Sequence, residues 1–231
     1  MKGNTKIALY GIGNIKDERI YLALQNKKVN FHRPDDFKSW FNILIVHQNR
    51  FKGHHTGKNK KNYLPESFIP SFFDLVIWGH EHECFTEPVY NNEVGFHVYQ
   101  PGSSVVTSLI QAESKPKCMG MLELYLDRFR VLPIRLETVR PFVFQQIELK
   151  NFGYRLQLQD DVEKFIEEKI EEMLTEAKYW GLKTDSNNEP CEITDPLVLN
   201  IRSLPILRLK IEFSGYQITR TNFIVSKYSG R

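Results

Sequence analysis

The chain has 231 residues, of which 41% are hydrophobic, and its 31 basic and 28 acidic side chains give a formal net charge of +3. This content is ample for a folded core, and no apolar stretch reaches the roughly 20 residues that cross a membrane. The mild positive charge permits nucleic-acid binding without requiring it. The three widely spaced cysteines, Cys84, Cys118 and Cys191, argue against a disulfide framework and for a reducing compartment.

The first 145 residues have the pattern of an α/β region. Near-continuous apolar runs predict strands that are covered on both faces, and alternating patterns predict hairpins further along. We expect strands at 7–10, 41–47, 75–79, 88–90, 95–99, 120–126 and 130–136, a helix at 17–25 and a short helix at 66–73, with hairpin turns at 91–92 and 127–128.

Residues 146–231 form a second predicted region. Apolar side chains at spacings of three and four predict an amphipathic helix from Asp160 to Trp180, with Asp160 and Asp161 at its N-terminal cap and Gly181 at its C-terminal cap. A polar loop follows at 183–195. We expect strands at 197–201 and 206–213, and another apolar stretch lies at 223–225.

Histidines follow two of the predicted buried strands. One strand ends at His47, and the other ends at Gly79 and leads directly into His80 and His82. Residues two apart on an extended chain project the same way, and glycine lets the backbone turn without a side chain in the way. Neutral imidazoles are the commonest protein ligands of metals, so these three histidines are candidate ligands of a divalent ion.

Plainer interpretations of these residues stay open. A single histidine after a strand, such as His47, is more often a hydrogen-bonded loop residue than a ligand, whereas the shared facing of His80 and His82 favours ligation. Cys84 extends the pattern to His-x-His-x-Cys, which is a weaker indication of zinc because no second cysteine lies nearby. The remaining histidines, His32, His54, His55 and His97, are expected at the surface or in cross-strand contacts.

Two segments are candidates for contact with phosphate. A loop rich in lysine, with Lys52, Lys58, Lys60 and Lys61, leaves the strand that ends in His47, and it is either a solvated loop or an arm that contacts phosphates. The segment Gln100–Val106 contains Pro-Gly followed by Ser103 and Ser104, whose hydroxyls and backbone N–H groups suit phosphate, although the same composition also suits a plain turn.

At this point the residues resemble a known family. The chain is similar to the meiotic recombination 11 nucleases of eukaryotic double-strand-break repair, which are calcineurin-like metallophosphoesterases. The motifs that carry the resemblance are Ile7–Gly11, Asp17–Arg19, Asn26–Val29, Val46–Arg50, Asp74–Cys84, Gln100–Leu109 and Thr138–Arg140, with weaker similarity at Lys169–Leu174 and Leu207–Gly215.

The resemblance implies a manganese-dependent DNA phosphodiesterase with two ions in its complete site. By motif, His47 and His80 would ligate one ion and His82 the other. We also expect Arg50, the four loop lysines, Ser103, Ser104 and Arg140 to contact DNA. The implied fold is the second half of a metallophosphoesterase β-sandwich with flanking helices, in residues 1–145, followed by a partial α+β DNA-binding capping domain in residues 146–231.

The family also implies partners and a location. These are DNA, a coiled-coil ATPase of the structural-maintenance type, a nibrin-type regulatory subunit and a second copy of the nuclease, although the upstream region that makes the homodimer is missing here. The implied processes are double-strand-break repair, homologous recombination and meiosis in the nucleus, without a membrane.

The chain departs from the family upstream. The phosphoesterase pattern also needs an Asp-x-His, a Gly-Asp whose carboxylate bridges the metals, and an Asn-His that supplies the catalytic acid, and none of them occurs here. Asp17, Asp35 and Asp36 stand in the wrong contexts to replace them. Because a bridging carboxylate is needed to offset the repulsion between two cations, we expect weak binding of one ion and little nuclease activity from this chain alone.

Two functions therefore stay open. The chain is either part of an endonuclease and 3'-5' exonuclease whose other half lies outside this sequence, or a natural short form without catalysis that binds DNA or repair partners. Another calcineurin-like phosphatase is a weaker third alternative. We also expect low solubility, because strands that normally pair with the upstream half would expose apolar surface.

Overall fold

The computed structural model describes residues 3–51, 62–153, 159–182, 193–216 and 228. The chain forms two compact units. The first contains residues 1–104 and 118–134, and the second contains residues 105–117 and 135–231. The predicted lysine-rich loop and the apolar stretch at 223–225 lie outside the described residues.

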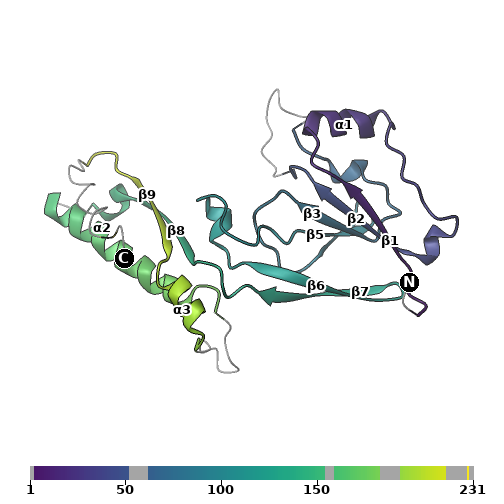
Figure 1. Cartoon of the computed structure of the whole chain (residues 1–231). Coiled ribbons are helices and arrows are strands. Elements are labelled where there is room, and N and C mark those ends of the chain that lie inside the picture. The colour runs from purple at the N-terminus through teal and green to yellow at the C-terminus, as the bar shows by residue number, and fades with distance from the viewer. Residues whose placement is uncertain (1–2, 52–61, 154–158, 183–192, 217–227, 229–231) are drawn as a thin grey trace. The chain divides into compact units, whose positions relative to one another are not determined.

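The first unit is built on a five-stranded sheet in the order β1-β2-β3-β5-β4 (Figure 1). Strands β1, β2, β3 and β5 run parallel, and β4 pairs antiparallel with β5. The strands span Ile7–Ile12 (β1), Phe41–His47 (β2), Leu75–Gly79 (β3), Val89–Asn91 (β4) and Phe96–Tyr99 (β5). The mixed α/β class predicted from the sequence is confirmed.

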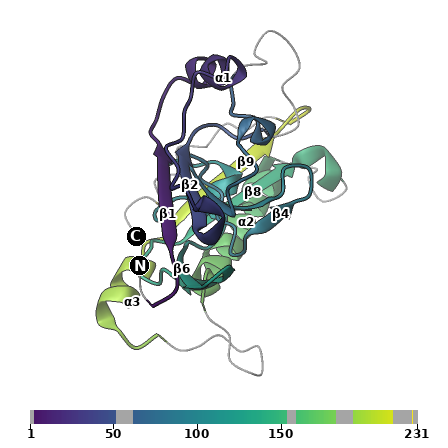
Figure 2. The same cartoon turned by 90° about the vertical axis from the view of Figure 1, so that its right-hand side faces the viewer.

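Hydrophobic side chains cover one face of this sheet. Leu44, Val76 and Trp78 are completely buried there, in a cluster that includes Phe73 and to which helix α1 (Asp17–Gln25) contributes the partly buried Leu24. The helix occupies the residues that were predicted for it, and its acidic first turn suits the positive end of a helix dipole. In Figure 2, α1 lies above the upper ends of β1 and β2.

A hairpin of β6 (Cys118–Tyr125) and β7 (Arg128–Arg135) packs on the other face of the sheet. Its inward side chains meet Phe41, Ile43, Leu75 and Tyr99. The coverage is incomplete toward β1, where Leu9 is 68% exposed.

The second unit combines a parallel pair of strands with a long helix. Strand β8 (Phe142–Glu148) pairs with β9 (Ile206–Glu212), and helix α2 (Gln159–Tyr179) lies against them in Figure 1. Helix α3 (Pro196–Arg202) precedes β9. Short 3₁₀ turns complete the elements at Phe37–Ser39, Glu66–Phe68, Gln111–Ser114 and Leu149–Phe152.

Several predictions from the sequence need correction. Residues 197–201 are helical, because Asp195 accepts a hydrogen bond from the backbone N–H of Leu197 and Pro196 occupies the first turn. Strand β8 was not predicted, and the helix expected at 66–73 is a single 3₁₀ turn. Helix α2 already begins at Gln159, so the two aspartates expected at the cap lie inside its first turn.

Two other expectations are confirmed, one at the C-terminal end of helix α2 and one in a contact of His97. Gly181 has a φ of +67° just beyond helix α2, which is the left-handed conformation that a C-terminal cap requires. His97 makes the expected cross-strand contact, with its ring 4.8 Å from the ring of Tyr90.

Among the described helices, none combines the length and the apolar character that a membrane crossing demands.

Candidate metal centre and its surroundings

Two of the predicted ligands meet at the carboxyl ends of two adjacent parallel strands, β2 and β3. In the register of β2 and β3, His47 lies opposite Gly79, so the strand end that carries His47 adjoins the residue before His80. The imidazole rings of His47 and His80 approach edge-to-face, with centroids 5.1 Å apart and an interplanar angle of 74°. The structure thus brings these two side chains together, and their role as metal ligands stays a prediction.

A side chain at Gly79 would crowd His47 and the neighbouring strand. A Cβ atom at this position would lie 3.0 Å from Nδ1 of His47 and 3.1 Å from the carbonyl oxygen of Val46. The next residue, His80, has a φ of +72°, which is uncommon for a residue with a Cβ. Surrounding contacts must hold this conformation, since it is costly by itself.

The segment that follows His47 is held at each residue. Gln48 donates from Nε2 to the carbonyl oxygen of Gly13 at 3.1 Å, and its own carbonyl oxygen accepts from Nε1 of Trp78 at 2.8 Å. The carbonyl oxygen of Asn49 accepts from the N–H of Leu64 at 3.0 Å. This backbone is therefore tied to both neighbouring loops.

A chain of side chains links helix α1 to His80. Nδ2 of Asn49 donates to Oδ2 of Asp17 at 2.6 Å, and the backbone N–H of Asn49 donates to Oδ1 of Asp17 at 3.3 Å. On its other side, Oδ1 of Asn49 lies 3.1 Å from Nε2 of His80. Asp17 thus has a place beside the candidate centre, although only its position at the start of a helix was evident in the sequence.

The loop that carries His80 and His82 is held from two directions. The carboxylate of Glu81, which is 6% exposed, accepts from the backbone N–H of Arg50 at 2.8 Å. The carbonyl oxygen of His82 accepts from the backbone N–H of Ser103 at 3.4 Å. At Gly102, a Cβ atom would lie 2.7 Å from that same oxygen, so the Pro-Gly-Ser-Ser turn packs directly on the histidine loop.

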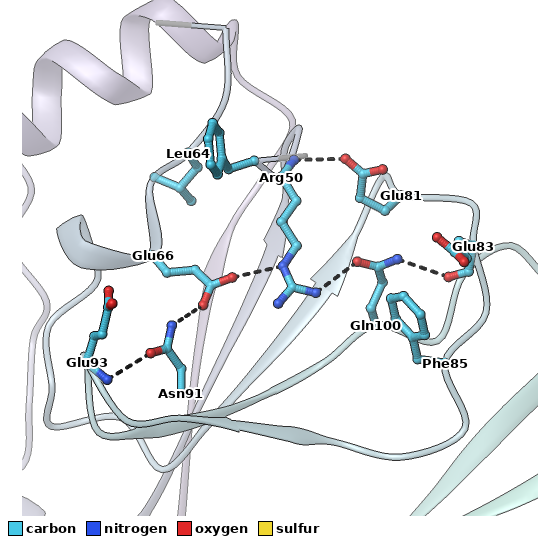
Figure 3. A pocket seen from close by; sticks show the side chains of 10 residues that line it. Arg50, Leu64, Glu66, Glu81, Glu83, Phe85, Asn91, Glu93 and Gln100 are labelled. Atoms are coloured by element: carbon cyan, nitrogen blue, oxygen red, sulfur yellow. Dashed lines mark hydrogen bonds and ion pairs between the residues drawn. The ribbon is translucent and has the colours of Figure 1, made fainter. Parts of the chain in front are cut away.

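A pocket of about 400 Å³ adjoins this loop (Figure 3). Arg50 lies in its wall and donates from Nε to Glu66 at 2.8 Å and from Nη1 to Gln100 at 3.2 Å. Asn91 donates to the second oxygen of Glu66 at 2.6 Å. The other lining residues include Glu81, Glu83 and Glu93, together with Phe51, Leu64 and Phe85. None of these carboxylates was singled out in the sequence, because they come from separate segments.

The residues predicted to contact DNA differ in their exposure and in the hydrogen bonds that they already make. Lys52, Lys58, Lys60 and Lys61 lie outside the described part of the chain. Ser104 is exposed, Ser103 is half-buried, and Arg50 is engaged in the acidic pocket. Arg140 belongs to the second unit, where its guanidinium donates to the carbonyl oxygens of Leu204 and Pro205. Their role in DNA contact stays a prediction.

The histidines fit a metal ion as a partial ligand set. Two imidazoles at this separation suit one ion, whereas within the described residues no group of three or more His, Cys, Asp or Glu side chains is arranged to hold one. His82 therefore does not complete such a group here, and Cys84 is a buried free thiol. The ligand roles of His47, His80 and His82, and the identity of the metal, stay predictions.

The fold and this edge of the sheet define the class of the first unit. A mixed α/β sheet whose strand ends carry the paired histidines, followed by a separate unit of helices and strands, is consistent with part of a metallophosphoesterase-type domain and a capping region.

Comparison with known proteins identifies the family within that class. Residues 129–231 match the family described as the Mre11 DNA-binding presumed domain. The whole chain is 38% identical to the double-strand break repair protein mus-23 of Neurospora crassa and covers 31% of that protein. It is 37% identical to the double-strand break repair protein MRE11 of Arabidopsis thaliana, again over 100% of the chain and 30% of the relative.

A vertebrate relative gives the same result. The double-strand break repair protein MRE11 of Homo sapiens is 41% identical over 220 residues, which are 93% of this chain and 28% of that protein. The chain thus spans less than a third of the length of these relatives. The resemblance to the meiotic recombination 11 family is confirmed, and the chain corresponds to a part of its members.

Proposed function

We propose that this chain is part of a manganese-dependent DNA nuclease that acts in double-strand-break repair, and that His47 and His80 hold one of its metal ions. The observation that carries the proposal is the convergence of the two rings, 5.1 Å apart, at the carboxyl ends of adjacent parallel strands. The relatives' names, which describe double-strand break repair proteins, support the choice of substrate and process.

The residues of this chain would act by holding and aligning. His47 and His80 would share one ion, and His82, whose carbonyl is held by Ser103, would reach toward the second. When bound, a manganese pair supplies polarisation of a phosphate oxygen and activation of a water for in-line attack. The contacts of Glu81 and Asn49 would keep the histidines in place without touching the substrate.

The proposal includes the partners and location that the family implies. These are DNA, a coiled-coil ATPase, a nibrin-type subunit and a second copy of the nuclease, in the nucleus and in homologous recombination and meiosis. The match of residues 129–231 to a presumed DNA-binding domain supports DNA as the first of them. We further propose that the 231 residues alone cleave DNA little or not at all, because they lack the bridging carboxylate and the catalytic acid.

A chimera tests the nuclease proposal directly. The upstream part of the Neurospora crassa relative, which is 38% identical over this chain, would be fused to these 231 residues. We expect manganese-dependent nicking of circular single-stranded DNA by the chimera, loss of nicking in its His47→Ala and His80→Ala variants, and retention in His32→Ala, a matched change at an exposed histidine. Equal nicking by all four proteins would contradict the proposed ligands.

The alternative is a short form that binds DNA without cleaving it. The match to a presumed DNA-binding domain is the observation that favours this alternative. It predicts that the 231-residue chain binds DNA without metal and that its affinity falls steeply as salt rises, since lysine and arginine contacts release counterions from the phosphates. Absence of salt-dependent binding, measured by fluorescence anisotropy with a labelled oligonucleotide, would exclude it.

A further inference from the structure

Helix α1 contributes the carboxylate of Asp17 to the surroundings of His80, which itself follows a strand. Asp17 is the first residue of that helix and is only half-buried, yet both of its oxygens face Asn49. The short contact between Oδ2 of Asp17 and Nδ2 of Asn49, at 2.6 Å, is typical of a charge-assisted hydrogen bond.

The chemistry of these groups fixes each proton in turn. An ionised carboxylate only accepts hydrogen bonds, so the amide of Asn49 must present its NH₂ group to Asp17. Its oxygen then necessarily faces Nε2 of His80, 3.1 Å away. Because an amide oxygen also only accepts, Nε2 of His80 must carry the ring proton when the imidazole is neutral. Nδ1 then carries the unprotonated lone pair of the ring, and it is the atom available to a metal ion.

We infer that Asp17 and Asn49 are positioning residues that select the tautomer and the ring orientation of His80. This inference rests on the proposed role of His80 as a metal ligand. A histidine that ligates through one nitrogen commonly donates from the other to a fixed acceptor, which raises its basicity and holds the ring. Here the acceptor is an amide whose own orientation is set by a carboxylate 32 residues earlier in the sequence.

The two hydrogen bonds that join Asp17 to Asn49 and Asn49 to His80, called the relay below, also explain how the unusual backbone conformation of His80 is held. Its φ of +72° would be costly without compensating contacts. The hydrogen bond from Nε2 to Asn49 anchors the side chain, while the neighbouring Glu81 anchors the loop through the N–H of Arg50. The two contacts hold successive residues of one turn to the segment that follows His47.

A reversal of charge at residue 17 gives the sharpest test. In Asp17→Lys the ammonium group donates to Oδ1 of Asn49, so the amide turns its NH₂ group toward Nε2 of His80 and the proton moves to Nδ1. Glu18→Lys is the matched control, because Glu18 is exposed, lies in the same acidic first turn and undergoes the same change of charge. Asn49→Ala removes the acceptor altogether.

The readout is nuclear magnetic resonance of the 231-residue chain labelled with ¹⁵N in its histidines, at a pH about two units above the ordinary histidine pKa of about 6.5. The signals of His80 are identified by their loss in His80→Gln. We expect Nε2–H in the unaltered chain and in Glu18→Lys, Nδ1–H in Asp17→Lys, and loss of the slowly exchanging ring proton in Asn49→Ala. Unchanged His80 signals in both Asp17→Lys and Asn49→Ala would overturn the inference.

Titration with Mn²⁺, followed by paramagnetic broadening of the His80 signals, tests the consequence for metal. We expect the apparent affinity to fall about 10- to 100-fold in Asn49→Ala and Asp17→Lys relative to Glu18→Lys. A changed tautomer with unchanged affinity would overturn the positioning role. If the unaltered chain binds no Mn²⁺ but shows the expected tautomers, the metal proposal fails while the relay stands, so the two failures are distinguishable.

Discussion

Substitution of Gly102 by alanine is expected to distort the loop that carries His82. A Cβ atom there would lie 2.7 Å from the carbonyl oxygen of His82 and 2.8 Å from the backbone nitrogen of Cys84. Ordinary contact begins at 3.4 Å, so the two backbones must separate by about 0.7 Å. Neither neighbour is the end of a flexible side chain, and the loop cannot give way cheaply.

The magnitude has two parts. Overpacking of this kind costs about 1–3 kcal/mol. The φ of +74° at Gly102 adds about 1–2 kcal/mol for any residue with a Cβ. We therefore expect Gly102→Ala to lower the free energy of unfolding by about 2–5 kcal/mol.

Gly95→Ala separates these two contributions. Gly95 has a similar φ of +83°, but a Cβ atom there would meet nothing within 4 Å. It should therefore lose only the conformational part, about 1–2 kcal/mol. Both variants would be unfolded in urea, with fluorescence of the buried Trp78 as a signal of the first unit. Equal losses for the two variants would refute the steric argument, because only Gly102 is crowded.

Three further results are expected. Glu81→Ala should destabilise the first unit by about 1–3 kcal/mol in urea unfolding, because the N–H of Arg50 loses its acceptor, whereas Glu81→Gln should cost less. Lys117→Met should lower the free energy of unfolding by about 3–5 kcal/mol, because the fully buried carboxylate of Glu113, 2.6 Å from the ammonium group of Lys117, loses its counter-charge. A loss no larger than that caused by replacing an exposed lysine would contradict this expectation. Leu9→Lys, at a residue 68% exposed on the edge strand β1, should reduce self-association in light scattering and change the free energy of unfolding by less than about 0.5 kcal/mol.

The sequence predicts the strand ends of the site because their signals are local. An apolar run that stops at His47 and another that stops at Gly79 are sufficient to place two histidines at one edge of a parallel sheet. Helix α1 and helix α2 are likewise predicted from their periodicity. These features depend on residues within a few positions of one another, so a single sequence reveals them.

The surroundings of the site could not be predicted in the same way. Asp17 and Asn49 are 32 positions apart, and Arg50 and Gln100 are 50 apart, so their contacts exist only after folding. The error at 197–201 has a different cause. The hydrophobic pattern there suits a strand, but Asp195 followed by Pro196 begins a helix, and the capping hydrogen bond decided the outcome.

The charges beside the candidate metal centre bear on the path that DNA would take under the proposed function. Arg50 directs two of its nitrogens to Glu66 and Gln100, so it is already engaged within a pocket that Glu83 and Glu93 also line. Among the described residues that line the pocket, a phosphate would meet the carboxylates of Glu66, Glu81, Glu83 and Glu93 and the already engaged guanidinium of Arg50, and repulsion in a partly desolvated site is costly. Under the proposed nuclease function, a DNA backbone would therefore reach the histidines from outside the pocket, while Glu66 holds the side chain of Arg50 and Glu81 holds its backbone N–H.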